Sequence, residues 1–267
     1  SPAPIAKTIS VIAGVSEMIR CGGSAAATRV DRAATARHTP TMPSTEDLVD
    51  RFRRCCADAG FDLVQPFATS WWTEEPTLPA FGDRGSLAVV VANSGALWPK
   101  LCDALRREPS RIDASEHIVD VWAVESVEAA ARATAIDHRI LWAHALGAEA
   151  VPIQRIAQVA GLAWLSPANL SIHPRFGPWI GLRAVVIFDL PIPDTVRPRV
   201  DDPCGHCDQA CLPAFTAARE GPAGWRSWLA IRDACPLGRE HRYSEDQIAY
   251  HYTKDRDILR SAAGAAD

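Results

Sequence analysis

The sequence predicts an α/β fold, with a central sheet flanked by helices, in a chain of 267 residues. Short apolar runs typical of buried strands alternate with segments whose apolar residues recur at helical spacing, which is the pattern of a layered α/β domain. The composition agrees, because 48% hydrophobic and 22% charged residues are ordinary for a globular protein of this length.

The first elements are a helix and two strands. The helix begins at Ser44 with a sequence like a capping box, and Gly60 ends it. A short strand is predicted over 61–67. The segment SLAVVVAN, residues 86–93, is apolar at positions facing both ways and therefore predicts a strand buried on both faces.

The alternation continues to about residue 189. Leu97, Leu101 and Leu105 lie on one face of the next predicted helix. Further helices are predicted over 116–136 and 153–164, and further strands over 138–144 and about 179–189.

Beyond Pro191 the character of the chain changes. The segment PIPDTVRPRVDDP is too rich in proline for a central strand. The segment GWRSWLAIRDAC predicts a helix, and a second helix begins with a capping box at Ser244 and Gln247. The terminal SAAGAAD is expected to fray.

Charge and cysteine usage limit the classes of function. A net charge of −4 gives no general basic field for nucleic acid, and no apolar run approaches the ~20 residues of a membrane span. Residues 1–41, rich in Ala, Ser, Thr and Arg, are interpreted as a disordered leader or extension ahead of a single domain over 42–267. The eight cysteines lack the spacing of a secreted scaffold, which favours the cytoplasm.

A cysteine-rich loop over 201–215 is a candidate metal site. It carries Cys204, Cys207 and Cys211 at the spacing C-x2-C-x3-C, and thiolates so placed can point at one metal. Cys235 is the candidate fourth ligand, with His206 as an alternative. The spacing suits either zinc or an iron–sulfur cluster, and a set of thiols without metal is the other interpretation.

The segment SIHPRFGPWIGLRAVVIF, residues 171–188, combines a stiff turn with a strand that contains an arginine. Phe176 and Trp179 flank the Gly-Pro turn, so we expect them to form a flat floor for a large planar ligand. By strand alternation Arg183 shares a face with Val185, while Leu182 and Ala184 share the other. A lone arginine there needs a carboxylate or an acidic ligand, and Arg232 is a second candidate for holding one.

Arg175 is interpreted either as part of a pocket wall or as one partner of a surface salt bridge. His173 is interpreted as a turn residue or a metal ligand. No GxGxxG, P-loop, HExxH or GxSxG motif is present, so the sequence gives no support for a classical nucleophile–His–acid enzyme.

Three motifs together resemble the CblC-type cobalamin-processing proteins, whose human member is the methylmalonic aciduria and homocystinuria type C protein. They are SIHPRFGPWIGLRAVVIF, WRSWLAIRDA and RYSEDQIAYHY, and GFDLVQPFATSWW and SLAVVVANSGALW precede them in the expected order. The resemblance spans about residues 45–260. It implies a modified flavin-nitroreductase-like fold that binds cobalamin base-off and removes its upper axial ligand.

The activities implied are those of a cyanocobalamin reductase that eliminates cyanide, with electrons from reduced FMN or FAD, and of an alkylcobalamin dealkylase that uses glutathione or another acidic thiol. The resemblance assigns the thiol carboxylates to Arg183, Arg232 and, with a poorer match, Arg256. It assigns contacts with cobalamin to the following residues: Val151, Pro152, Ile153, Gln154, Leu165, Ser166, Ser171 and Leu182. A flavin reductase or a downstream cobalamin-trafficking protein would be the macromolecular partner, with no nucleic acid or membrane.

The cysteine segment departs from the animal pattern. CGHCDQAC resembles the cluster segment of epoxyqueuosine reductases, and AGLAWL, HPRFGPW, DLPIP and DPCGHC occur in the same order in that family. The acidic catalytic region and the second full cysteine motif of those enzymes are missing. Two alternatives therefore stay open: an iron–sulfur, cobalamin-dependent reductase of that type, and a corrinoid carrier without catalysis.

Overall fold

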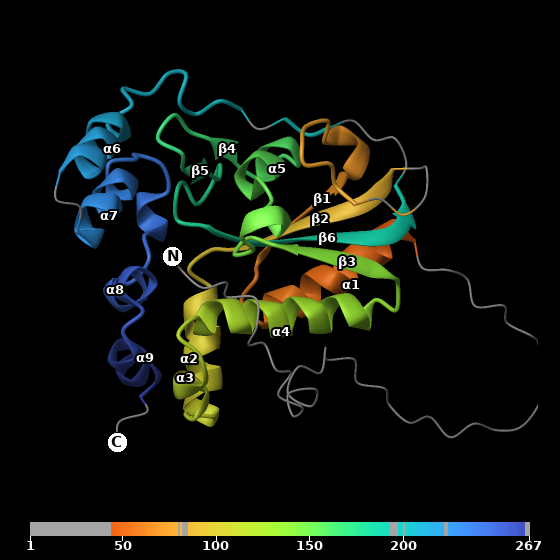
Figure 1. Cartoon of the computed structure of the whole chain (residues 1–267), viewed down its shortest axis with the longest axis horizontal. Helices are drawn as coiled ribbons and strands as arrows, with labels where there is room; N and C mark the ends of the chain where they lie inside the picture. Colours follow the sequence, from red (N-terminus) through yellow and green to blue (C-terminus); the bar gives the residue numbers. More distant parts are fainter. Residues whose placement is uncertain are drawn as a thin grey trace, which may run out of the picture.

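The computed structural model describes residues 44–79, 81, 85–192, 197–199, 201–221 and 224–264. The predicted leader over 1–41 lies outside the described residues. A four-stranded sheet in the order β1-β2-β6-β3 occupies the centre, and every neighbouring pair of its strands is antiparallel. Helices cover both faces, and α6 to α9 descend along one side (Figure 1). The prediction of a sheet flanked by helices is therefore confirmed as a mixed α and β fold.

The four sheet strands are β1 (Leu63–Ala68), β2 (Ser86–Asn93), β3 (His138–Trp142) and β6 (Gly181–Pro191). All four coincide with predicted strands to within two residues, because each is an apolar run bounded by polar or turn residues. A small hairpin of β4 (Trp164–Leu165) and β5 (Ser171–Ile172) has strands too short to show a periodicity in the sequence.

The predicted helices are present, whereas the helices over 111–114, 211–220 and 256–263 were not predicted, and the second of these begins inside the loop expected over 201–215. Ser44 and Ser244 cap two of the predicted helices, since each hydroxyl accepts a hydrogen bond from the backbone N–H three residues on. The helices are α1 (Thr45–Asp58), α2 (Leu97–Arg107), α3 (Arg111–Ala114), α4 (Ile118–Ala133), α5 (Ile153–Val159), α6 (Cys211–Glu220), α7 (Trp225–Asp233), α8 (Glu245–Thr253) and α9 (Arg256–Ala263).

Two expectations about helix ends were wrong. The helix predicted over 153–164 stops at Val159, because Gly161 takes a left-handed conformation at φ 83° and residues 164–165 join the hairpin. The last seven residues were expected to fray, but Ala263, which is one of them, is buried within α9. Residues 265–267 lie outside the described residues.

The core lies on both faces of the sheet. Leu87, Val89 and Val91 of β2 pack in a cluster with α1, α2 and α4, while the alternating Ala88, Val90 and Ala92 pack in a second cluster with α5. Each residue of β2 is buried, as its apolar sequence predicts. Among the described residues no helix is both long and apolar enough to cross a bilayer.

The alternation of side chains in β6 breaks at Arg183. The register passes from Val91 opposite Ala184 to Ala92 opposite Leu182, which leaves Arg183 as the extra residue of a β-bulge. Leu182 consequently packs in the same cluster as Val185, and Ala184 packs on the opposite face. The prediction that Leu182 and Ala184 share a face is therefore wrong.

Candidate functional site

The turn at HPRFGPW is locked by hydrogen bonds and close packing. His173 and Gly177 exchange two backbone hydrogen bonds of 2.9 Å, and His173 Nδ1 accepts from the N–H groups of Arg175 and Phe176. Gly177 has φ 54°, and a Cβ there would meet the carbonyl oxygen of Leu237 at 2.0 Å. The turn therefore requires glycine, and His173 has the turn role considered for it. Burial lowers the pKa of His173.

The aromatic residues of this turn do not form an open floor. Trp179 is 2% exposed and packs against Tyr243 in a cluster with α7 and α8. Phe176 is half-buried and lies against His241, with a ring separation of 4.7 Å. The expected flat surface for a planar ligand is therefore wrong at Trp179, whose ring is part of the core. Arg175 is exposed above the Phe176 ring and forms no ion pair with the described residues.

Arg183 is the centre of a buried polar cluster. Its Nε donates to Asn93 Oδ1 over 2.7 Å, and its Nη1 lies 3.7 Å from Asp120 Oδ1 of α4. The side chain is 15% exposed. Burial lowers the pKa of Arg183, and the charge of Arg232 acts in the same direction, while Tyr243 and Asp120 oppose it. The bulge thus aims a guanidinium at a site where positive charge exceeds negative charge.

Arg232 reaches the same cluster from α7. Its Nη1 donates a hydrogen bond to the Pro178 carbonyl, so it is attached to the HPRFGPW turn. The neighbouring Asp233 does not pair with it, because that carboxylate accepts from Arg242 over 2.8 Å. Arg232 is near enough to Arg183 for its charge to lower the pKa of Arg183.

Helix α8 and the residues before it complete the cluster. Burial raises the pKa of Tyr243 to about 12, and its buried hydroxyl faces Asn93 without a hydrogen bond of normal geometry to the described residues. Burial and the charges of Arg183, Lys254 and Arg232 hold the pKa of His251 well below 6.5, so its ring is neutral. Burial also lowers the pKa of Lys254.

Sequence reasoning did not assign Asn93, Tyr243, His251 or Asp120 to the site. For Asn93, the available signal was a polar residue at the end of an apolar strand. For Tyr243 and His251, it was their position in the motif RYSEDQIAYHY. Asn93 and Arg183 are 90 residues apart in the chain, and a contact of that separation leaves no local pattern.

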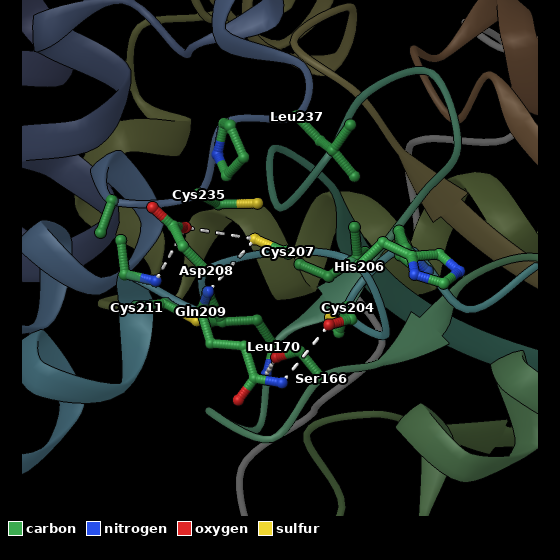
Figure 2. A pocket seen from close by; sticks show the side chains of 15 residues that line it. Ser166, Leu170, Cys204, His206, Cys207, Asp208, Gln209, Cys211, Cys235 and Leu237 are labelled. Atoms are coloured by element: carbon green, nitrogen blue, oxygen red, sulfur yellow. Dashed lines mark hydrogen bonds between the residues drawn. The ribbon is translucent and has the colours of Figure 1, made fainter.

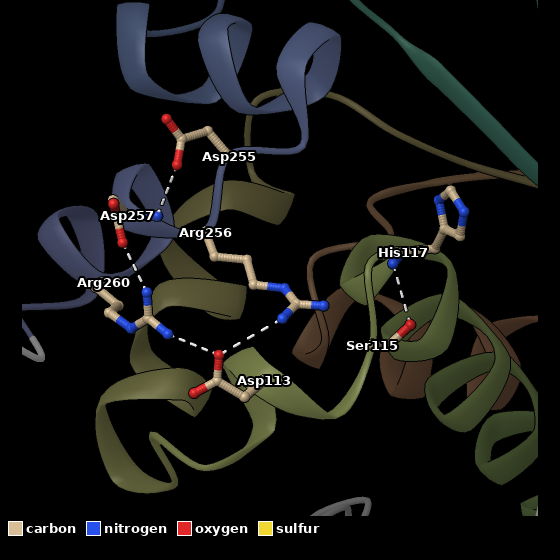
Figure 3. A network of polar contacts seen from close by, with 7 residues as sticks. All are labelled: Asp113, Ser115, His117, Asp255, Arg256, Asp257 and Arg260. Carbon is tan, nitrogen blue, oxygen red and sulfur yellow. Dashed lines mark hydrogen bonds and ion pairs between the residues drawn. The ribbon is translucent and has the colours of Figure 1, made fainter.

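Arg256 lies in a different network, at the start of α9. Its Nη1 is 3.7 Å from Asp113 Oδ1 of α3, and the same oxygen accepts from Arg260 Nη2 over 2.6 Å (Figure 3). This network connects α9 to α3. The structure thus gives Arg256 a carboxylate partner of its own, apart from the contacts made by Arg183 and Arg232.

The residues expected to contact cobalamin gather around α5 and the β4–β5 hairpin. Val151 and Pro152 lead into α5, Ile153 is buried at its start, and Gln154 Nε2 donates to the Asn169 carbonyl over 2.8 Å. Leu165 of β4 pairs with Ser171 of β5. Leu182 of β6 packs in the same cluster as α5.

Two serines of the hairpin differ in their hydrogen bonding. The Ser166 hydroxyl accepts from the Leu170 N–H over 3.0 Å and is therefore part of the turn. The Ser171 hydroxyl is buried without a hydrogen-bond partner in the described structure. Burying a hydroxyl without a hydrogen bond costs free energy. Among the residues expected to contact cobalamin, the Ser171 hydroxyl would therefore gain most from a hydrogen-bond partner.

The four cysteines Cys204, Cys207, Cys211 and Cys235 line one cavity of about 400 Å³ (Figure 2). Burial raises the pKa of Cys204 to about 11, and burial also raises the pKa values of Cys211 and Cys235. Among the described residues, no three His, Cys, Asp or Glu side chains are arranged to share one metal ion.

Comparisons with known proteins identify the fold. Models of known protein families give no match, and no curated protein matches in sequence. A solved structure of a B12-trafficking protein CblC from C. elegans, described as a human MMACHC homologue, is similar with a TM-score of 0.63. The two are 15% identical, and the match covers 81% of this chain and 96% of that one.

Epoxyqueuosine reductase from Bacillus subtilis is a weaker structural match. It has a TM-score of 0.42 and 12% identity, and the match covers 82% of this chain and 79% of that one. The similarity to the C. elegans protein has the higher TM-score of the two and covers more of the matched chain. The chain therefore has a CblC-like fold.

Proposed function

We propose that this protein binds cobalamin base-off and removes its upper axial ligand, by reductive loss of cyanide and by transfer of alkyl groups to an acidic thiol. The CblC-like fold supports a role in cobalamin processing. The residues that would contact the corrinoid lie around α5, the β4–β5 hairpin and the start of β6. The buried cluster at Arg183 would bind the thiol.

The observation that carries the proposal is the excess of positive charge in this cluster. The charge of Arg232 lowers the pKa of Arg183, and the only carboxylate that pairs with Arg183 among the described residues is Asp120 at 3.7 Å. Guanidinium groups bind carboxylates well and remain charged. A thiol co-substrate that carries carboxylates, such as glutathione, would supply the missing negative charge.

Neither dealkylation nor decyanation needs a nucleophile from the protein. In dealkylation, the thiolate sulfur attacks the alkyl carbon, the cobalt–carbon bond breaks, and its electron pair stays on cobalt. In decyanation, an electron from reduced flavin reaches cobalt and cyanide leaves. The protein would hold the two substrates in place and exclude water, which matches its lack of a nucleophile–His–acid motif.

Replacing either arginine tests the assignment of the thiol. We expect Arg183→Gln and Arg232→Gln each to weaken thiol binding by roughly 10- to 100-fold, because a charge-assisted hydrogen bond contributes about 1.5–3 kcal/mol. The measurement is the thiol dependence of methylcobalamin dealkylation under anaerobic conditions, followed by the visible spectrum. Arg132→Gln, which breaks an exposed pair with Glu128, is the matched control.

The same assay separates an enzyme from a carrier. Conversion of methylcobalamin with thiol, or of cyanocobalamin with reduced flavin, supports the proposal. Tight binding of both cobalamins without conversion of either would overturn the catalytic part and favour a corrinoid carrier. Equal thiol dependence in Arg183→Gln and Arg132→Gln would remove Arg183 from the thiol site.

A further inference from the structure

The ring of Tyr243 is fixed in the core next to the buried polar cluster at Arg183. Tyr243 is 8% exposed. Its ring packs edge-on against that of Trp179 with 5.6 Å between the centroids, and the ring of His251 in α8 lies 5.9 Å away. A Cβ added at Gly95 would contact Tyr243 Cδ1 at 3.7 Å. Because a tyrosine hydroxyl lies on the axis of its ring, this packing also fixes the position of the hydroxyl oxygen.

The Tyr243 hydroxyl is a buried donor without an acceptor. Burial raises the pKa of Tyr243 to about 12, so the hydroxyl keeps its proton at neutral pH. It is enclosed by protein and has no hydrogen-bond partner among the described residues. A phenol in that position loses its hydrogen bond to water on folding and gains none in return, which costs free energy. Such a hydroxyl calls for a partner outside the folded chain.

The polar groups beside this hydroxyl mostly supply donors. After burial, the charges of Arg232 and Arg183 act most strongly on the pKa of Tyr243, and both lower it. A guanidinium has five N–H donors and no acceptor. Asn93 also faces the hydroxyl, but its Oδ1 already accepts from Arg183 Nε over 2.7 Å, and its Nδ2 donates to the Ser94 carbonyl over 2.7 Å. Donors therefore outnumber acceptors around the hydroxyl.

The carboxylates of this region already have partners. Asp62 acts on the pKa of Tyr243 in the direction opposite to the arginines. Its two oxygens accept hydrogen bonds from Ser94, one from the backbone N–H over 2.8 Å and the other from the hydroxyl over 2.6 Å. Asp120 of α4 pairs with Arg183 at 3.7 Å. The acceptor for Tyr243 would therefore have to come from a ligand.

From this donor without an acceptor and the arginines beside it, we propose that the Tyr243 hydroxyl donates a hydrogen bond to a carboxylate of the acidic thiol. This contact rests on the proposed function, which places that thiol in the cluster at Arg183. A hydrogen bond from a hydroxyl to a carboxylate is short and strong, and Arg183 would supply the positive charge beside it. A buried donor also rejects analogues that lack its acceptor. Tyr243 therefore selects thiols that carry a carboxylate over neutral thiols.

The test is calorimetric titration of the cobalamin-free full chain with S-methylglutathione, which keeps the carboxylates of glutathione but has no free thiol. We expect Tyr243→Phe to weaken its binding by roughly 10-fold or more, because a hydrogen bond to a charged group is lost. The dimethyl ester of the same compound should bind more weakly, and with equal affinity to the wild type and Tyr243→Phe, since it has no carboxylate. A change in packing alone would weaken the binding of both compounds.

Thermal unfolding without ligand gives a second, independent measurement. Tyr243→Phe should unfold at the same temperature as the wild type or at a higher one, because it removes a buried hydroxyl that has no acceptor. A clearly lower unfolding temperature would overturn the proposal, since the hydroxyl would then have a partner within the protein. Tyr250→Phe is the matched control for binding, because Tyr250 is 1% exposed and its oxygen accepts from the backbone of Ile118. It should bind S-methylglutathione as the wild type does.

The outcomes separate this contact from the proposed function. Equal binding of S-methylglutathione to the wild type and Tyr243→Phe would overturn the contact and leave the proposed function in place. Binding that depends on Tyr243, without any dealkylation of methylcobalamin by glutathione, would support the contact and overturn the catalytic proposal. If the wild type bound no S-methylglutathione, the contact would be overturned, and the dealkylation assay would decide the proposed function by itself.

Discussion

At the scale of single residues, Ser171 and Ser126 share a property that is rare in folded proteins. Each has a buried hydroxyl without a hydrogen-bond partner in the described structure, Ser171 in β5 and Ser126 in α4. Only Ser171 lies in the group expected to contact cobalamin. The pair therefore offers a matched comparison between a hydroxyl that a ligand would satisfy and one that stays within the core.

We expect Ser171→Ala to weaken cobalamin binding by roughly 5- to 10-fold, which corresponds to one hydrogen bond of about 1 kcal/mol. Neither Ser171→Ala nor Ser126→Ala should lower the free energy of unfolding by more than about 1 kcal/mol, because no hydrogen bond is lost. Calorimetric titration with cobalamin gives the affinities. An equal affinity for the two variants would contradict a ligand contact at Ser171.

The predictability of the site differs from residue to residue. Arg183 could be identified from sequence, because a charged residue inside an apolar strand demands a partner. The partner was not predictable, since Asn93 belongs to β2 and Asp120 to α4. The prediction that Leu182 and Ala184 share a face of the sheet was also wrong, because the sequence of the strand does not reveal the β-bulge at Arg183.

At the scale of elements, the HPRFGPW turn and the segment after Cys235 depend on each other. The positive φ of Gly177 and the closeness of Leu237 leave no space for a side chain. We expect Gly177→Ala to lower the free energy of unfolding by about 2–4 kcal/mol, through backbone strain and displacement of Leu237. Urea denaturation followed by circular dichroism measures this change.

Gly224 provides the control for that substitution. It precedes α7 at φ −77°, and a Cβ there would meet nothing within 4 Å. Gly224→Ala should change the free energy of unfolding by less than about 1 kcal/mol. If the two variants were equally stable, the close contact between the turn and Leu237 would not exist as described.

The strands and capped helices were the elements that the sequence predicted best. Apolar runs such as SLAVVVAN and the serines at 44 and 244 carry their signals within a few residues. The hairpin of β4 and β5 has two residues per strand and shows no period. Helix α9 was missed because its small residues suggested a frayed end, whereas Leu259 and Ala263 pack against the core.

At the scale of the whole molecule, the buried positive cluster makes stability depend on pH. Burial, together with the charges of Arg183, Lys254 and Arg232, lowers the pKa of His251 and holds its ring neutral. Its pKa in the folded chain lies below the ordinary 6.5, so below that pH the unfolded chain binds more protons than the folded one. The stabilisation is present above pH 6.5 and is lost as the pH falls.

We therefore expect the free energy of unfolding to fall below pH 6.5, with up to about 1.4 kcal/mol per pH unit from this one group. His251→Gln should make the dependence shallower, whereas His117→Gln, a change at an exposed position, should leave it unaltered. Urea denaturation at several values of pH measures the slopes. Equal slopes in the wild type and His251→Gln would show that His251 is not held neutral by folding.

The order of the sheet strands was the global feature that sequence reasoning could not supply. The strands β2 and β6 are neighbours although about ninety residues separate Asn93 from Arg183. This pairing brings Arg183 to Asn93, and α5 packs in the same core cluster as β6. Resemblance in three motifs implied the fold, and the structural similarity to a CblC protein bears out that coarse prediction.

Base-off binding is tested by the visible spectrum of methylcobalamin titrated anaerobically with the purified protein. We expect a shift to the base-off spectrum that saturates at one cobalamin per chain. The shift should persist in Arg183→Gln, because that side chain is assigned to the thiol. A spectrum that stays base-on in the presence of excess protein would contradict the proposal that this chain binds cobalamin base-off.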